Sequence, residues 1–205
     1  IGLVKLMRDS DKISAEEQKQ MLSVIEDSGN NLLNLVRDVL DREAKVAESE
    51  ELDYSEVKVG ELLARVISMN KAKAIVKDIN LDYSIKPSGF NVLIDQIKIE
   101  IVINNLVANA LKFTPSGGSI SVEVSKEKDV IKFEVRDTGI GIPEKMQHDL
   151  FRDPKKSSRL GTSGEVGTGL GLDIVQLYVE LHKGKIWVES TLNKGTSFFI
   201  EIPQQ

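Results

Sequence analysis

Cysteine is absent from this sequence, and long apolar runs and an excess of basic residues are missing as well. The lack of cysteine excludes disulfides and thiolate metal sites, and it fits a reducing compartment. No apolar run reaches the roughly 18 residues that a membrane-spanning helix requires, and no signal peptide is visible. The formal net charge of −5 argues against nucleic acid as a partner, because DNA-binding proteins need a basic face.

What is present suits a globular protein. The 205 residues are 40% hydrophobic and 29% charged, which is enough apolar material to bury a core in one or two domains. The chain begins with Ile1 instead of methionine, so we expect a fragment of a longer protein. We also expect it to be cytoplasmic, with any membrane segment lying outside the fragment.

Residues 14–47 are predicted to form one long helix. Ser14 is a suitable N-cap, and Glu17 three residues later completes a capping box. Apolar residues then follow in steps of three and four and would form one stripe: Leu22, Ile25, Leu32, Val36 and Val39. Residues 1–8 would end a preceding antiparallel helix, which predicts a helical hairpin over residues 1–48.

The apolar stripe of this hairpin needs a partner, because a lone amphipathic helix is marginal in water. Formation of a homodimer would bury the stripe in a four-helix bundle. The alternative is a single helix that lies on the second domain.

Strands and helices alternate in the second region, from about Leu52 onward. Strands are predicted at 54–59, 79–85, 90–95, 185–190 and 196–202, together with a hairpin over 118–139 that turns at 126–129. Helices are predicted at 60–76, at 97–112 and in a segment that ends near Leu181. This order predicts an α+β fold, an α/β sandwich with a mixed sheet and three main helices.

Polar residues interrupt the second of these helices along one stripe. Offsets of four and three place Asn105, Asn109 and Lys112 on the same face. An amide oxygen suits Mg²⁺, and a lysine supplies a point charge for phosphate. Such contacts would offset the cost of about 1–3 kcal/mol for burying an unpaired amide. A polar surface stripe is the alternative, and the apolar density from Ile97 to Leu111 stands against it.

A carboxylate and two glycines follow the hairpin, in the motif DTGIGIP at residues 137–143. Asp137 could accept a hydrogen bond from the exocyclic amine of adenine, while Gly139 and Gly141 let the backbone approach closely. An ordinary turn that closes a strand would explain the same residues.

A second glycine motif, GEVGTGLGL, precedes the last helix. Gly167, Gly169 and Gly171 would let backbone N–H groups converge on an anion, although a flexible loop with a helix cap is the alternative. Between the two motifs lies a basic cluster of Lys155, Lys156 and Arg159. It would cover phosphates as part of a lid, or it is simply a solvated charged face.

Five short motifs occur in order and at fitting distances: NNLVANALKFTP, DTGIGIP, LF, GTGLGL and KGTSFFIEIP. As a set they resemble the N, G1, F, G2 and G3 boxes of the sensor histidine kinase catalytic domain, which has the Bergerat ATP-binding fold. The resemblance covers residues 52–203, and we take the domain to be 52–205. It implies that ATP and Mg²⁺ bind between three helices and a mixed sheet.

The resemblance also implies roles for individual residues. Asn109 matches the metal ligand, with Asn105 as a second candidate. Asn105 and Lys112 match the catalytic positions at the phosphates, and Asp137 matches the adenine-binding aspartate. The remaining nucleotide-binding positions match Gly139, Gly141, Phe151, Lys155, Lys156, Arg159, Gly167, Thr168, Gly169, Leu170, Gly171 and Thr196.

One substitution separates the subclasses of this fold. The related ATPases, such as gyrases and the ninety-kilodalton heat-shock chaperones, carry a glutamate that activates water where this chain has Asn105. Asparagine cannot act as a general base, so water attack should be slow and a kinase is favoured. A noncatalytic nucleotide- or regulator-binding module and a hydrolytic ATPase are the other hypotheses.

Only two histidines are present, His148 and His182. Neither lies in a motif like H-E-L-R-x-P-L, which surrounds the phosphoacceptor in the family, so we expect the hairpin to be truncated before that residue. The resemblance implies phosphoryl transfer to a histidine outside the fragment and then to the receiver domain of a response regulator. We expect His148 to be solvated, His182 to suit a helix C-terminus and Trp187 to lie in the core.

Overall fold

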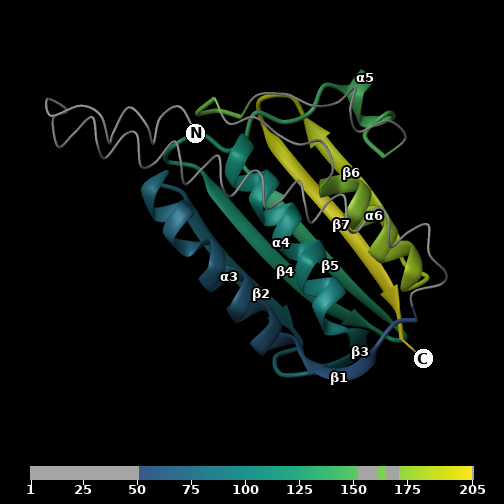
Figure 1. Ribbon diagram of the computed structural model, residues 1–205. Coiled ribbons are helices and arrows are strands. Elements are labelled where there is room, and N and C mark those ends of the chain that lie inside the picture. Colours follow the sequence, from purple (N-terminus) through teal and green to yellow (C-terminus); the bar gives the residue numbers. More distant parts are fainter. Residues whose placement is uncertain (1–50, 152–160, 165–170, 205) are drawn as a thin grey trace, which may run out of the picture. The chain divides into compact units, whose positions relative to one another are not determined.

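The computed structural model describes residues 51–151, 161–164 and 171–204 (Figure 1). The chain divides into two compact units, Ile1–Glu50 and Glu51–Gln205. Because the described residues begin at 51, the predicted hairpin over residues 1–48 and its dimer lie outside them. None of the helices within the described part is long and apolar enough to cross a membrane.

The second unit contains seven strands and four helices among its described residues. In chain order these are β1 (Tyr54–Lys58), α3 (Val59–Val76), β2 (Asn80–Lys86), β3 (Asn91–Asp95), α4 (Gln96–Phe113), β4 (Ser119–Glu127), β5 (Val130–Asp137), α5 (Glu144–Gln147), α6 (Gly171–Leu181), β6 (Lys185–Thr191) and β7 (Gly195–Pro203). Every predicted strand and helix of this region is confirmed. The single turn of α5 was not predicted.

The five-stranded sheet has the order β2-β4-β5-β7-β6, and β1 pairs with β3 in a separate two-stranded sheet. The β2–β4 pair is parallel, while the other neighbours in the large sheet are antiparallel. Helices α3, α4 and α6 cover one face of this sheet (Figure 1). The predicted α/β sandwich with a mixed sheet and three main helices is confirmed.

Along most of the central strands β4 and β5, every second side chain lies in the core. In β4, Ile120, Val122 and Val124 are buried while their neighbours point outward, and β5 repeats this period of two. Helix α4 meets them with an apolar face spaced by three and four residues: Ile99, Val102, Ile103, Leu106, Val107, Ala110 and Leu111. The polar stripe of α4 is therefore turned away from the core.

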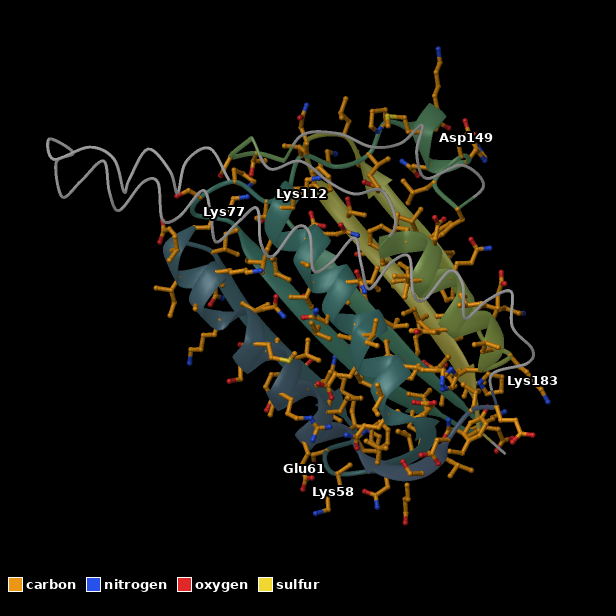
Figure 2. All side chains as sticks on the ribbon, viewed as in Figure 1. Lys58, Glu61, Lys77, Lys112, Asp149 and Lys183 are labelled. Carbon is orange, nitrogen blue, oxygen red and sulfur yellow. The ribbon has the colours of Figure 1, made fainter. Side chains whose placement is uncertain are left out.

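The C-terminal ends of α3 and α4 are tied together by a lysine. Lys77 donates from Nζ to the carbonyl oxygens of Leu111 at 2.7 Å and Lys112 at 3.1 Å. Figure 2 shows Lys77 and Lys112 at the same end of the two helices. A cation at a helix C-terminus satisfies carbonyls that have no donor within the helix, so the last turn of α4 is held in place.

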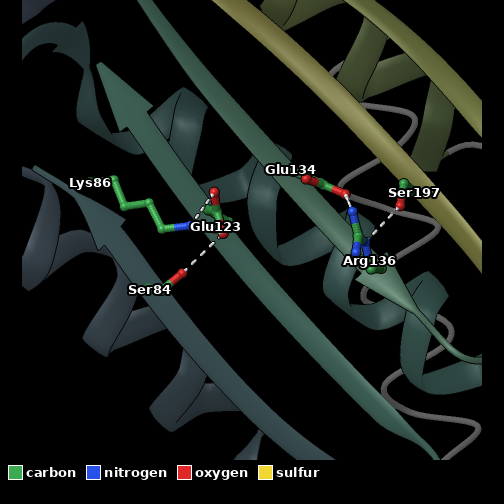
Figure 3. A network of polar contacts seen from close by, with 6 residues as sticks. All are labelled: Ser84, Lys86, Glu123, Glu134, Arg136 and Ser197. Carbon is green, nitrogen blue, oxygen red and sulfur yellow. Dashed lines mark hydrogen bonds and ion pairs between the residues drawn. The ribbon is translucent and has the colours of Figure 1, made fainter. Parts of the chain in front are cut away.

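The other face of the sheet is polar. Lys86 pairs with Glu123 at 3.0 Å and Arg136 pairs with Glu134 at 2.7 Å (Figure 3). Trp187 also lies on this face, because it pairs with Phe199 in the register while Val188 and Phe198 face the helices. The prediction that Trp187 lies in the core is wrong.

Trp187 is half-buried through a contact across the strands. Its ring stacks on that of Phe199, with centroids 5.1 Å apart, and Lys132 Nζ lies 5.2 Å from the centre of the Trp187 ring. Cross-strand stacking and a cation over the ring stabilise a large apolar side chain on an otherwise polar surface.

His182 follows the last residue of α6, as predicted, but it is a buried neutral residue. Its Nδ1 lies 2.6 Å from the Tyr178 carbonyl oxygen, and its Nε2 accepts a hydrogen bond from the Asp95 backbone N–H at 3.1 Å. Only the neutral ring with a proton on Nδ1 can make both bonds. Burial lowers the pKa of His182 accordingly. His148 is exposed, as expected.

Candidate functional site

Helix α4 forms one wall of the candidate site. Asp95 caps its N-terminus by accepting a hydrogen bond from the Lys98 backbone N–H at 3.0 Å. Further along the helix, Asn105, Asn109 and Lys112 are all partly exposed, whereas most of the residues between them are buried. The structure thus brings these three residues onto one accessible stripe, as the sequence predicted.

Asn105 lies against the first residue of α6. Its Nδ2 donates to the Ile101 carbonyl oxygen at 2.9 Å. A Cβ placed on Gly171 would lie only 2.9 Å from Asn105 Oδ1, so a larger residue at this position would push the Asn105 side chain aside. The last glycine of the G-x-G-x-G motif and the stripe on α4 are therefore neighbours.

Asn109 offers an amide to a ligand. Within the described part of the chain its side chain has no hydrogen-bond partner, although it is partly buried. The hydrogen-bonding groups of this amide are therefore left for a ligand, for a cation or for solvent.

The DTGIGIP loop packs against the last turn of α4. The Ile140 backbone N–H donates to the Phe113 carbonyl oxygen at 3.1 Å. A Cβ on Gly139 would lie 2.5 Å from the same oxygen, so only glycine permits this approach. Gly141 has a φ of +67°, and a Cβ there would lie 2.1 Å from the Thr191 carbonyl oxygen. The loop is thereby fixed between α4 and β6.

Asp137 lies at the end of β5 with only 6% of its surface exposed. Its Oδ1 accepts hydrogen bonds from the backbone N–H groups of Gly139 at 2.7 Å and Thr196 at 3.3 Å. Burial raises the pKa of Asp137 to about 6, and these two bonds oppose the rise only in part. No donor among the described residues reaches Oδ2, which is left to accept a hydrogen bond from a ligand.

Thr196 and Ser190 form a hydroxyl pair beside this carboxylate. Ser190 Oγ donates to the Gly195 carbonyl oxygen at 2.9 Å and accepts from the Ile142 backbone N–H at 2.8 Å. Because the Ser190 proton is used, the 3.0 Å contact between the two hydroxyls is a donation from Thr196. Sequence reasoning missed Ser190, since only the register of β6 and β7 places it opposite Thr196.

Phe151 lies at the edge of the same region, where its ring meets that of Phe198 edge to face with centroids 6.4 Å apart. Seven predicted site residues lie outside the described residues: Lys155, Lys156, Arg159, Gly167, Thr168, Gly169 and Leu170. The roles of all seven stay predictions. The others lie on α4, at the end of β5 and in the loop after it, just beyond α5, at the start of α6 and on β7.

The donor set fits a nucleotide with a magnesium ion. No group of three or more His, Cys, Asp or Glu residues able to hold a metal occurs in the described ranges. A cation at Asn109 would therefore be completed by oxygens from water and from phosphate, which Mg²⁺ favours. The buried acceptor at Asp137 would lie at the other end of the ligand and suit an exocyclic amine.

The arrangement defines a class: an α/β sandwich whose helix-covered side gathers amide, carboxylate and close-packed glycine groups at one site. Residues 94–205 match the family described as histidine kinase-, DNA gyrase B-, and HSP90-like ATPase. The chain belongs to this family and carries the catalytic ATP-binding domain of a sensor histidine kinase.

Individual relatives agree with this assignment. The chain is 35% identical over 195 residues to the circadian input-output histidine kinase CikA of Synechococcus elongatus, an overlap of 93% of this chain and 26% of that protein. It is 36% identical over 190 residues to the signal transduction histidine-protein kinase BarA of Escherichia coli K12, covering 90% of this chain and 21% of BarA. The chain thus spans about a quarter of these relatives.

A solved structure agrees as well. Full-length ShkA in complex with AMPPNP superposes with a TM-score of 0.76 at 28% identity, covering 94% of this chain and 40% of ShkA. The shared fold and sequence support ATP as the ligand of this family.

Proposed function

We propose that this chain binds Mg-ATP and serves as the kinase unit of a two-component signalling protein. ATP would supply the γ-phosphoryl group, which passes to a histidine outside this chain and then to an aspartate on the receiver domain of a response regulator. The single observation that carries the proposal is that Asn109 and Asp137 Oδ2 both lack hydrogen-bond partners within the described part of the chain, beside the same helix.

The chain's own residues bind and orient in this proposal. Asp137 and Thr196 hold the adenine end, while Asn105 and Lys112 lie at the phosphate end and Asn109 provides an oxygen for the cation. Catalysis is then positioning and charge neutralisation, which is the usual role of protein groups in phosphoryl transfer.

Asn105 supports a kinase over a hydrolytic ATPase. An amide cannot take a proton from water, and its Nδ2 is already used by the Ile101 carbonyl oxygen. ATP is therefore preserved for another nucleophile. A noncatalytic nucleotide-binding module is the second candidate, because neither histidine of the chain lies in a phosphoacceptor motif. His148 is exposed, and His182 is buried with both ring nitrogens hydrogen-bonded.

The partners follow from the same proposal. We infer a homodimer through residues 1–48, a response regulator as acceptor, no nucleic acid, and a cytoplasmic location with any membrane anchor in other segments. These assignments rest on the family and on the predicted hairpin.

The Asn109→Asp substitution tests the metal assignment. It keeps an oxygen ligand but adds a charge beside the phosphates, so we expect affinity for AMP-PNP with Mg²⁺ to fall by about tenfold or more. Isothermal titration with and without Mg²⁺ measures this effect. Asn80→Asp makes the same change on an exposed strand residue and should leave binding unchanged. Equal binding by both variants would contradict the assignment.

A longer chain that includes the upstream segment tests the activity. A kinase labels its histidine with the γ-phosphoryl group and transfers the label to a receiver domain. Steady phosphate release without labelling would instead indicate the ATPase, and nucleotide binding without either product would indicate the noncatalytic module.

A further inference from the structure

The carbonyl groups at the C-terminal end of α4 have several donors from outside the helix. Such carbonyls have no partner within a helix and must be satisfied elsewhere. Lys77 approaches the Leu111 and Lys112 oxygens from α3, at the end of the helices seen in Figure 2. This is also the end of α4 that carries Lys112, whose Nζ lies 4.9 Å from the centre of the Phe113 ring.

A second anchor reaches the same carbonyls from residues 161–164. The Thr162 backbone N–H donates to the Lys112 carbonyl oxygen at 3.0 Å. The Thr162 hydroxyl lies 3.2 Å from that oxygen and 3.1 Å from the Thr114 carbonyl oxygen. A hydroxyl has one proton, so it is shared between the two acceptors and spans the end of the helix.

The segment that carries Thr162 is itself a tight turn. The Gly164 backbone N–H donates to the Gly161 carbonyl oxygen at 3.0 Å, and Gly164 has a φ of +82°. Thr162 is exposed, so its bonds to α4 are not a by-product of burial in the core. Thr162 thus attaches the turn to the last turn of α4.

We propose that Thr162 is a positioning residue for the phosphate end of the nucleotide site. Its amide and hydroxyl fix the backbone of Lys112 and Thr114, and thereby the direction of the Lys112 side chain. This inference rests on the proposed binding of ATP. The adenine end is held separately, because Asp137 is fixed by β5, by β7 and by the Thr196 backbone N–H.

The test compares two nucleotides on the 205-residue chain by isothermal titration with Mg²⁺. AMP-PNP carries three phosphate positions, whereas AMP carries only the first. Thr162→Val removes the hydroxyl but keeps the branched shape and the backbone N–H. We expect affinity for AMP-PNP to fall by about three- to tenfold, with a smaller loss for AMP.

Two further variants make the comparison specific. Thr162→Ser restores the hydroxyl and should return the affinity for AMP-PNP to near the unsubstituted value. Ser116→Ala removes another exposed hydroxyl just beyond α4, one that contacts Asp78 at 3.3 Å and no carbonyl of the helix. It should leave the ratio of the two affinities unchanged.

The outcomes separate this inference from the proposed function. A selective loss for AMP-PNP that serine restores supports the positioning role. Equal losses for both nucleotides, or no loss, would overturn it while leaving ATP binding intact. Failure of the unsubstituted chain to bind either nucleotide would remove the proposed function, and the inference with it.

Discussion

The buried carboxylate of Asp137 is expected to lower the stability of the folded chain and to strengthen nucleotide binding. Its carboxyl group is buried, and its pKa is raised to about 6 from an ordinary value near 3.8. A raised carboxyl pKa means that the folded chain holds the proton more tightly than the unfolded chain. The associated stability is therefore greatest at acidic pH and is lost as the pH rises from about 4 to about 6.

We therefore expect Asp137→Asn to stabilise the nucleotide-free protein by about 1–3 kcal/mol at pH 7. The gain should shrink as the pH falls below 6, because the native carboxyl then becomes neutral too. Urea unfolding at several pH values measures the free energy of unfolding. An equal gain at every pH would show that the buried charge is not its source.

The same substitution should weaken nucleotide binding. Replacing the carboxylate removes the charge that strengthens a hydrogen bond from an exocyclic amine, so we expect about a tenfold loss for AMP-PNP at pH 7. Titration calorimetry provides the comparison. Unchanged affinity would mean that Asp137 is not the adenine acceptor.

Some features of individual residues could not be predicted from local sequence patterns. Ile186, Trp187 and Val188 are three consecutive apolar residues, so alternation could not reveal that Trp187 faces away from the helices. Ser190 contacts Ile142, and Thr162 contacts the end of α4, across long stretches of the chain. The pairing that creates such contacts is a property of the folded sheet and of the loop, and no local pattern encodes it.

Elements were predicted well wherever a period was clear. Helix α4 combines an apolar spacing of three and four with an aspartate N-cap, and β4 and β5 alternate strictly. The turn α5 has four residues and buries none of them, so it is too short to show a period. The polar stripe of α4 was predictable for the same reason as its core face, because both follow from one helical repeat.

His182 joins two elements and makes their packing sensitive to pH. It connects the end of α6 to β3 at Asp95, with the Lys98 ammonium 2.9 Å from Asp95 Oδ2 and the Tyr54 ring 5.7 Å from the imidazole. Because burial lowers the pKa of His182, the stability it provides is complete above about pH 6.5 and is lost as the pH falls further.

His182→Gln should test this connection. Glutamine offers a donor and an acceptor but does not titrate, and we expect it to cost about 1–3 kcal/mol at pH 8. The difference from the unsubstituted chain should narrow below pH 6.5, because only the histidine loses stability there. Urea unfolding between pH 8 and 5.5 would reveal this, and a constant difference would contradict it.

The whole second unit has features that oppose self-association. The edge strands of its five-stranded sheet are β2 and β6. Their exposed residues include Asp82, Lys86, Lys185 and Glu189. Charged edge strands resist pairing with another copy. Dimerisation is therefore expected to depend on residues 1–50.

Removal of residues 1–50 should give a monomer that still binds AMP-PNP, while the 205-residue chain should be a dimer. Light scattering after size-exclusion chromatography measures both masses, and calorimetry measures binding. A dimer of residues 51–205 would place the interface in the catalytic unit instead.

The candidate site draws on residues far apart in sequence, from Asn109 through Asp137 to Thr196, so it exists only while the chain is folded. Any nucleotide held there would shift the folding equilibrium by mass action alone. At a concentration one hundred times its Kd the gain would be about 2.7 kcal/mol. Cellular ATP would then stabilise the folded state of this unit, and depletion of ATP would raise its unfolded fraction and its exposure to proteolysis.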